Sequence, residues 1–207
     1  MNLKLKTIAN FVKSTDTVID TCCDHAYLAI YLKENNMCKE VFASDISEQA
    51  LNGAIENIKN KGLKIKTFLS DGFKDIYEKS IDTAIIAGVG TSTALSIVAS
   101  APKNIQHYII SSNNNYEELR TKMYEIGYFI QEEFIVEEND KFYPIMRFER
   151  VYQRETKYTL MYGKSNNKNY YRYLLQKEEE VYNKLPKKDF ITKFKHSGKV
   201  AYLQKLI

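Results

Sequence analysis

The chain has 207 residues and 44% apolar content, enough for one α/β domain of about 150 residues and an appendage. No segment approaches the roughly 20 apolar residues of a membrane span, and the first twelve residues lack the apolar core of an export signal. We therefore expect a cytoplasmic protein with no membrane partner. The net charge is +4, but residues 1–150 hold 17 Lys/Arg against 21 Asp/Glu, whereas residues 151–207 hold 13 against 5. Such a basic tail suits a polyanion partner, although a solvated helical face gives the same pattern.

The three cysteines, at positions 22, 23 and 38, form an odd set in a chain expected to stay in a reducing compartment. We therefore expect free thiols and no disulfide framework. A zinc site needs ligands that converge on one point. Cys22 and Cys23 are direct neighbours, no C-x-x-C pair occurs and the three histidines lie far apart, so we expect no metal.

Residues 17–126, taken in chain order, alternate short apolar runs with amphipathic segments. The apolar runs predict strands buried on both faces of a parallel sheet: Thr17–Thr21, Val41–Ser44, Ile65–Leu69, Ile81–Ala87 and Tyr108–Ser111. The intervening segments predict helices: Ala26–Asn35, Glu48–Lys61, Thr91–Ser100 and Tyr116–Ile126. This alternation implies right-handed crossovers and an open, doubly wound sheet.

Residues 128–152 break the alternation. Tyr128–Val136 and Pro144–Tyr152 predict two strands joined at Glu138–Lys141, which makes a hairpin in place of another crossover. Five parallel strands followed by an antiparallel hairpin are typical of the seven-stranded methyltransferase sheet, and they disfavour a dehydrogenase-type Rossmann sheet. We therefore predict an α/β, Rossmann-like domain with the sheet of class I methyltransferases over residues 1–155.

The remaining residues, 156–207, no longer alternate strand-like and helix-like segments. A polar turn at Gly163–Asn169 precedes a helical run over Tyr170–Leu185, which Pro186 interrupts, and Phe190–Ile207 predicts a second helix. Two helices joined by a short connection form an antiparallel hairpin. We expect this coiled-coil-like appendage to supply the basic surface of the chain.

Polar or small residues follow the predicted strands at their carboxyl ends, where open α/β sheets bind ligands. The first strand ends at Asp20 and is followed by Cys22 and Cys23, which are compact enough to let the backbone approach a cofactor. Asp45, with Ile46 beside it, ends the second strand about 25 residues later, where a carboxylate can accept both hydroxyls of a ribose. These residues are candidate cofactor ligands.

The third and fourth strands carry the same signal. Asp71 and Gly72 follow the third strand, where the acid can bond an adenine amino group, and Gly88 and Gly90 follow the fourth and leave space over the reacting centre. No G-x-G-x-x-G follows the first strand and no G-x-x-x-x-G-K-[ST] occurs, which disfavours dinucleotides and P-loop chemistry. S-adenosyl-L-methionine needs no pyrophosphate cradle, so it remains the favoured cofactor.

Three pieces of the sequence together resemble a known family. DHAYL at Asp24–Leu28, IAGVG at Ile86–Gly90 and the C-terminal helical pair are similar to the bacterial tRNA (adenine-22, ring N1) methyltransferases, the TrmK family. The family usually has I-G-S where Thr21–Cys23 stands, and Q-P-N where this chain has Ser111–Asn113. Lys4 aligns with an arginine of many relatives, which implies a contact with the cofactor carboxylate.

The resemblance implies methyl transfer from S-adenosyl-L-methionine to N1 of one adenine in the D arm of tRNA. Separately, we expect a monomer. Asp24 is the candidate to stabilise the cationic product or to contact the cofactor, and His25 and Tyr27 are candidates to position the base or take up a proton. Packing of the first helix against the sheet is the alternative role for His25 and Tyr27. An adenine N1 in folded tRNA must leave its stack, so we expect tail lysines to contact phosphates, namely Lys177, Lys187, Lys188, Lys193, Lys195 and Lys199.

Two other functions remain open on the sequence alone. The cysteines in the turn, where glycine is usual, are compatible with an RNA-binding protein built on a catalytically inactive methyltransferase scaffold. A methyltransferase for another nucleic-acid substrate is equally compatible with the acids at the strand ends. Cofactor binding separates the first alternative from the enzyme.

Overall fold

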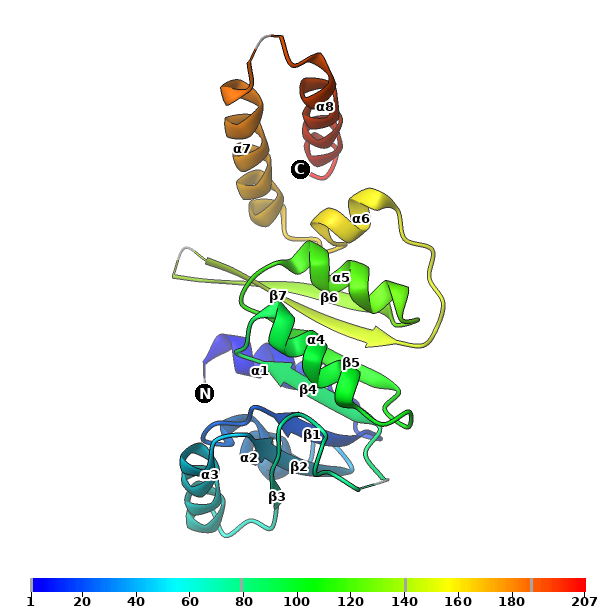
Figure 1. Ribbon diagram of the computed structural model, residues 1–207. Coiled ribbons are helices and arrows are strands. Elements are labelled where there is room, and N and C mark those ends of the chain that lie inside the picture. The colour runs from blue at the N-terminus through cyan, green and yellow to red at the C-terminus, as the bar shows by residue number, and fades with distance from the viewer. Residues whose placement is uncertain (1, 79, 140, 187) are drawn as a thin grey trace.

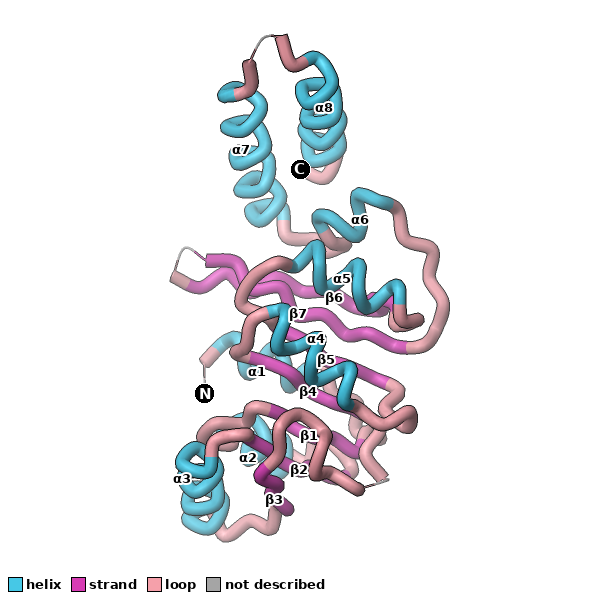
Figure 2. The backbone as a smooth tube through the Cα atoms, in the orientation of Figure 1, coloured by secondary structure: helices cyan, strands magenta, loops and turns pink. Residues whose placement is uncertain are grey.

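The computed structural model describes residues 2–78, 80–139, 141–186 and 188–207 and is built on one seven-stranded sheet with the order β3-β2-β1-β4-β5-β7-β6 (Figure 1, Figure 2). Strands β1 to β5 are parallel, and β7 runs antiparallel to both β5 and β6. The strands are β1 (Thr17–Thr21), β2 (Glu40–Asp45), β3 (Lys66–Leu69), β4 (Thr83–Ala87), β5 (His107–Ser111), β6 (Phe129–Glu138) and β7 (Lys141–Glu149). The predicted sheet is confirmed.

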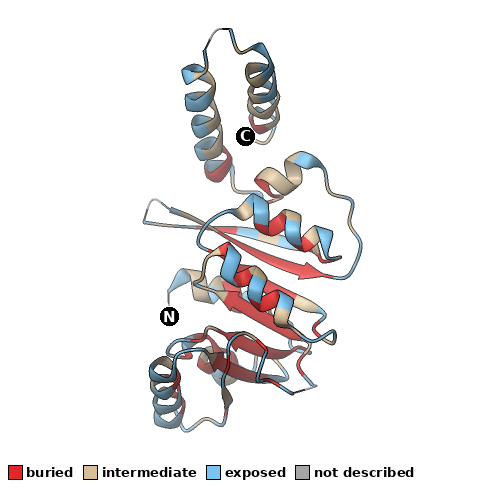
Figure 3. Cartoon of the chain, viewed as in Figure 1, coloured by how far each residue is buried: buried red, intermediate tan, exposed pale blue. Residues whose placement is uncertain are grey.

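Helices cover both faces of the sheet, because successive residues of a buried strand point to opposite sides. Val18 and Ile85 pack with α1, α2 and α3, whereas their neighbours Ile19 and Ile86 pack with α4 and α5. Figure 3 shows the central strands buried beneath these layers. The helices are α1 (Leu3–Asn10), α2 (Tyr27–Glu34), α3 (Glu48–Asn60), α4 (Thr91–Ser100) and α5 (Tyr116–Glu125).

The hairpin strands differ from prediction in their bounds. β6 extends to Glu138 and β7 begins at Lys141, so the turn is shorter than the predicted Glu138–Lys141, and Asp140 within it lies outside the described residues. β7 starts before Pro144, although proline cannot donate a ladder hydrogen bond. Only residues from Met146 onward pair with β5, so one side of β7 is open at Pro144, where proline is tolerated.

The C-terminal region forms α6 (Lys157–Tyr162), α7 (Lys168–Lys184) and α8 (Phe190–Gln204), and α7 and α8 make the predicted antiparallel pair (Figure 1). Its base is fixed to the sheet domain by an apolar cluster in which Tyr162, Tyr170 and Leu203 pack with Ile135 of β6. Tyr162, Tyr170 and Tyr171 are therefore core side chains of the appendage. The boundary at residues 155 and 156 stays a prediction, since this cluster draws on both sides of it.

Candidate active site

A pocket of about 230 Å³ lies beyond the carboxyl ends of β1 and β4. It brings together eight of the residues selected from the sequence, which come from α1, from β1 and the turn after it, from the start of α2 and from the end of β4: Lys4, Asp20, Cys22, Cys23, Asp24, His25, Tyr27 and Gly88. These positions are up to 84 residues apart in the chain. The parallel sheet joins them, because it gathers the carboxyl ends of its strands at one edge.

The turn between β1 and α2 has an unusual backbone. Cys22, Asp24 and Ala26 all adopt left-handed conformations, with φ of 57°, 47° and 56°. Non-glycine residues rarely do so, and each such residue costs on the order of 1–3 kcal/mol that its surroundings must offset. The Asp24 N–H donates to Asp45 Oδ2 at 3.0 Å, and the Cys23 N–H donates to the Ser44 carbonyl at 2.9 Å. The end of β2 therefore holds the strained turn in place.

Asp20 is the buried acid of the pocket. Asp20 is only 4% exposed. Burial raises the pKa of its carboxyl group to about 7, and the nearby negative charge of Asp45 adds to this effect. Burial, then the negative charges of Asp45, Asp20 and Asp71, raises the pKa of Cys22 to about 11. These three acids stand at or just after the ends of β1, β2 and β3, which the sheet register places side by side.

The surroundings of both thiols in the turn favour their protonated form. The pKa of Cys23 is raised by burial and by the charge of Asp20, as that of Cys22 is, so both stay protonated. All three cysteines are free. Within the described ranges, no group of three or more His, Cys, Asp or Glu side chains is placed to hold a metal ion. The two cysteines of the turn therefore act here as compact pocket walls.

Lys4 brings a positive charge to this acidic pocket. Its Nζ lies 5.0 Å from the centre of the Tyr143 ring of β7, and burial lowers the pKa of its ammonium group, while Glu138 opposes that effect. Lys4 belongs to α1, a helix that the sequence patterns did not predict. Asn2, whose side chain accepts from the Leu5 N–H at 2.9 Å, begins that helix and also lines the pocket.

Asp24, His25 and Tyr27 form the rim of the pocket. The His25 Nε2 lies 3.7 Å from Asp24 Oδ1, and the His25 and Tyr27 ring centres are 5.5 Å apart. Tyr27 is 55% exposed and the His25 side chain 50%, so neither is a core side chain that packs α2 against the sheet. Their exposure leaves them free to contact a substrate.

The other five selected residues do not line this pocket. Asp45 accepts from the N–H groups of Asp24 and Ser47, and Ile46 beside it is 66% exposed. Asp71 pairs with Lys74. Gly72 has φ of +62°, and a Cβ there would lie 2.5 Å from Ser100 Oγ, so its glycine serves packing. Gly90 is the N-cap of α4.

Sequence reasoning missed several residues that line the pocket, namely Asn2, Leu5, Leu28 and Ala87. Leu28 and Ala87 belong to the DHAYL and IAGVG segments, so the motifs could have identified them. Asn2 and Leu5 carried no comparable signal, because the short helix that presents them was not predicted. Tyr143 gave no local signal either, since it reaches Lys4 across 139 positions of sequence.

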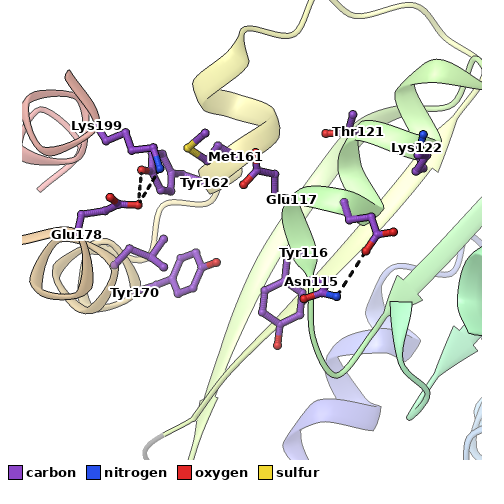
Figure 4. A pocket seen from close by; sticks show the side chains of 12 residues that line it. Asn115, Tyr116, Glu117, Thr121, Lys122, Met161, Tyr162, Tyr170, Glu178 and Lys199 are labelled. Carbon is purple, nitrogen blue, oxygen red and sulfur yellow. Dashed lines mark hydrogen bonds and ion pairs between the residues drawn. The ribbon is translucent and has the colours of Figure 1, made fainter. Parts of the chain in front are cut away.

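A larger pocket, of about 560 Å³, lies between α5, α6 and the helical pair (Figure 4). None of the candidate cofactor or catalytic residues lines it, although the tail lysine Lys199 does. Glu178 in its wall accepts from the Tyr162 hydroxyl at 3.0 Å and pairs with Lys199 at 3.4 Å. Glu117 and Glu118 add negative charge. This pocket is larger than the one beyond β1 and β4, but its wall is acidic and holds none of the candidate cofactor ligands, so we do not assign it to the cofactor.

The strand order, the antiparallel β7 and the acids at the ends of β1, β2 and β3 together define a class I methyltransferase fold. The chain belongs to the methyltransferase domain family, whose model matches residues 1–146. The described residues contain no helix that is both long enough and apolar enough to span a membrane.

Similar proteins extend this likeness over most of the chain. A Mycoplasma genitalium protein, named as a candidate tRNA methyltransferase, is 34% identical over 155 residues, which are 73% of this chain and 71% of that one. The structure of Mycoplasma capricolum TrmK with S-adenosyl-homocysteine is 28% identical, with a TM-score of 0.84 over 99% of this chain and 96% of that one. The tRNA (adenine(22)-N(1))-methyltransferase of Bacillus subtilis is 24% identical over 70% of this chain and 63% of its own length.

Proposed function

We propose that this protein transfers the methyl group of S-adenosyl-L-methionine to N1 of adenine 22 in the D arm of tRNA. The observation that carries the proposal is the pocket, where eight residues selected for this chemistry meet, in a chain similar over 99% of its length to a TrmK structure that holds S-adenosyl-homocysteine. The Bacillus subtilis relative is named for this reaction. S-adenosyl-L-methionine is the cofactor and tRNA is the class of substrate, and the D arm and position 22 are the finer part of the proposal.

The residues present fit this cofactor. Gly88 has φ of +83° and a Cβ there would meet no atom within 4 Å, so glycine keeps this side of the pocket open. Asp45 would hold the ribose with the carboxylate lone pairs that its two backbone donors leave free. Lys4 would face the cofactor carboxylate and Asp20 its cationic groups. When bound, the cofactor supplies an electrophilic methyl group, and an adenine ring nitrogen can accept it without first losing a proton.

The residues of the rim would act on the base. Asp24 has a side chain that is 71% exposed, and its carboxylate would favour the positive charge that appears on adenine after methylation. His25 and Tyr27, whose rings lie together, would position the base, since a displacement reaction depends chiefly on alignment. Proton uptake by either ring is not required by this proposal.

The helical pair would bind the tRNA backbone. Lys188 and Lys195 are exposed near the connected ends of α7 and α8, whereas Lys199 is already paired with Glu178. Lys187, which was also selected, lies outside the described residues. The affinity for tRNA should fall with salt, and a double variant, Lys188→Gln with Lys195→Gln, should make the slope of log affinity against log salt concentration less steep by about 2. Lys103→Gln, an exposed change before β5, is the matched control and should leave the slope unchanged.

The test of the reaction is transfer of labelled methyl groups to an unmodified tRNA with adenine at position 22, compared with the same transcript carrying guanine there. Label on the adenine transcript alone is the expected result. Label on neither, with intact binding of S-adenosyl-homocysteine, would overturn the substrate and favour another nucleic acid. Absence of calorimetric S-adenosyl-homocysteine binding would instead favour the catalytically inactive, RNA-binding scaffold.

Asp24→Asn tests the role of the rim within the same assay. It should lower kcat with little change in protein stability, because this side chain is largely exposed. Glu56→Gln, a change of the same kind at an exposed position of α3, is the control and should keep full activity. Cytoplasmic location and a monomeric state remain predictions, which fractionation of cells and light scattering of the purified protein would check.

A further inference from the structure

A hollow of about 390 Å³ lies between the β6–β7 hairpin, the segment after β5 and helix α7. The residues that matter in its wall are Asn113, Tyr143 and Tyr173, with Lys141 and Lys177. Sequence reasoning assigned no role to this hollow. Its volume falls within the range of sites that enclose small organic groups.

This hollow adjoins the cofactor pocket through two contacts. Tyr143 lines the hollow, and the Nζ of Lys4, which lines the cofactor pocket, lies 5.0 Å from the centre of its ring. Asn113 also lines the hollow, and its Nδ2 donates to the carbonyl of Gly88 at 2.8 Å. Gly88 in turn lines the cofactor pocket. The two cavities are therefore separated by a single pair of touching residues at each place, Lys4 with Tyr143 and Asn113 with Gly88.

The chemistry of the hollow suits a nucleobase attached to phosphates. Tyr173 is 41% exposed, and its ring centre lies 5.2 Å from that of Phe142. Base stacking on exposed aromatic rings is tolerant of sequence, and neighbouring cations attract the backbone. Lys141 and Lys177 are both exposed, and Lys177 Nζ lies 5.2 Å from the Tyr173 ring centre.

We propose that this hollow receives the ring of the flipped target adenine, with Tyr143 and Tyr173 as stacking residues and with Lys141 and Lys177 contacting the flanking phosphates. Asp24, His25 and Tyr27 would then act only on the edge of the base that faces the cofactor pocket. The inference rests on the proposed function and specifies where its acceptor base binds. The larger pocket of Figure 4 is less suited to this role, because its wall holds three glutamates against two lysines, Lys122 and Lys199, and so carries net negative charge toward the phosphates of a nucleotide.

Tyr173→Ala is the first test, because an exposed side chain on α7 can be removed with little effect on folding. Stacking is worth about 1–3 kcal/mol per base, so kcat/KM for tRNA should fall by about five- to 150-fold. The affinity for S-adenosyl-homocysteine should not change. Tyr173→Phe, which keeps the ring, should restore activity. Tyr77→Ala removes a tyrosine that is 83% exposed outside the hollow, and should behave as the unmodified protein.

A second measurement reads base capture without methyl transfer. A tRNA with 2-aminopurine at position 22 reports unstacking and restacking through its fluorescence when the protein binds, and this change should depend on the ring at 173. Tyr143→Leu should weaken it as well, with the fold checked by circular dichroism. Unaltered fluorescence and activity in both variants would overturn the hollow as the base site and leave the proposed function intact. Failure of the unmodified protein to methylate the adenine transcript would overturn the function, while the fluorescence change would still test the hollow.

Discussion

Glu133→Gln is the change that most directly tests how the basic helices are attached to the sheet domain. Glu133 of β6 and Arg120 of α5 form an ion pair at 2.6 Å, and both side chains are fully buried. Arg120 also donates to the carbonyl of Met161 at 3.2 Å, and Glu133 accepts from the backbone N–H of Lys164. The pair therefore connects the sheet domain to the segment that leads into α7.

Glutamine keeps the size of glutamate but removes its charge. Arg120 stays protonated, because an arginine cannot lose its proton inside a protein, and would be left as an unpaired buried cation. Breaking a buried pair in this way costs about 3–5 kcal/mol. Since a whole domain is stable by only about 5–15 kcal/mol, the variant should lose a large fraction of its stability.

Urea unfolding followed by circular dichroism measures this loss. The control is Glu125→Gln, which removes an ion pair with Lys122 on the same helix, where both side chains are more than half exposed. That change should alter the free energy of unfolding by no more than about 1 kcal/mol. A double variant, Arg120→Met with Glu133→Met, should be more stable than Glu133→Gln alone, since no buried charge remains. If Glu133→Gln costs no more than the control, the pair is not desolvated as described here.

Three further predictions concern single residues. Burial raises the pKa of Asp20 to about 7, and a cationic cofactor favours the ionised carboxylate. The affinity for S-adenosyl-L-methionine should therefore rise with pH between about 6 and 8. Calorimetry should show a weaker rise for Asp20→Asn, and an equal rise would contradict the assignment. For Glu149, burial is outweighed by hydrogen bonds from two basic side chains, and the pKa is lowered from 4.5 to about 2. The ionised Glu149 therefore stabilises the folded state above pH 4.5, and this stabilisation is lost as the pH falls toward 2. In urea titrations, the difference in unfolding free energy between the unmodified protein and Glu149→Gln should shrink across that interval. Gly163→Ala should destabilise more than Gly62→Ala, because both have positive φ but only a Cβ at 163 would collide with the Glu133 carboxylate; equal losses of unfolding free energy would contradict this.

The sheet could be predicted because its signals are local. The run Thr17–Thr21 is continuous and apolar up to its acid, and the structure places β1 at the same bounds. Ser47, directly before the predicted helix Glu48–Lys61, caps α3 through its hydroxyl by accepting from the Ala50 N–H at 3.2 Å. Patterns of this kind depend on neighbours within a few residues, so they can be recognised in the sequence without knowledge of the tertiary structure.

The missed elements are short or depend on distant partners. α1 has 8 residues and α6 has 6, too few to show a helical period clearly. The buried partners Arg120 and Glu133 are 13 residues apart on different elements. Charged residues are seldom fully buried, and nothing local distinguishes these two from solvated ones. For the same reason, the sequence indicated the acids of the pocket but not the hollow beside it, whose walls come from three separate elements.

The turn after β1 explains how a methyltransferase pocket can form without the glycine expected there. Cys22 and Asp24 adopt the left-handed conformations that glycine reaches at no steric cost, so the turn needs an external support. Asp45 provides it, because one of its oxygens accepts from the Asp24 N–H and the other from the Ser47 N–H. The same carboxylate is the proposed ribose ligand. Its loss would therefore weaken cofactor binding in two ways, through the missing ligand and through the relaxed turn, and the second effect makes the positions of Asp24 and His25 depend on Asp45 as well.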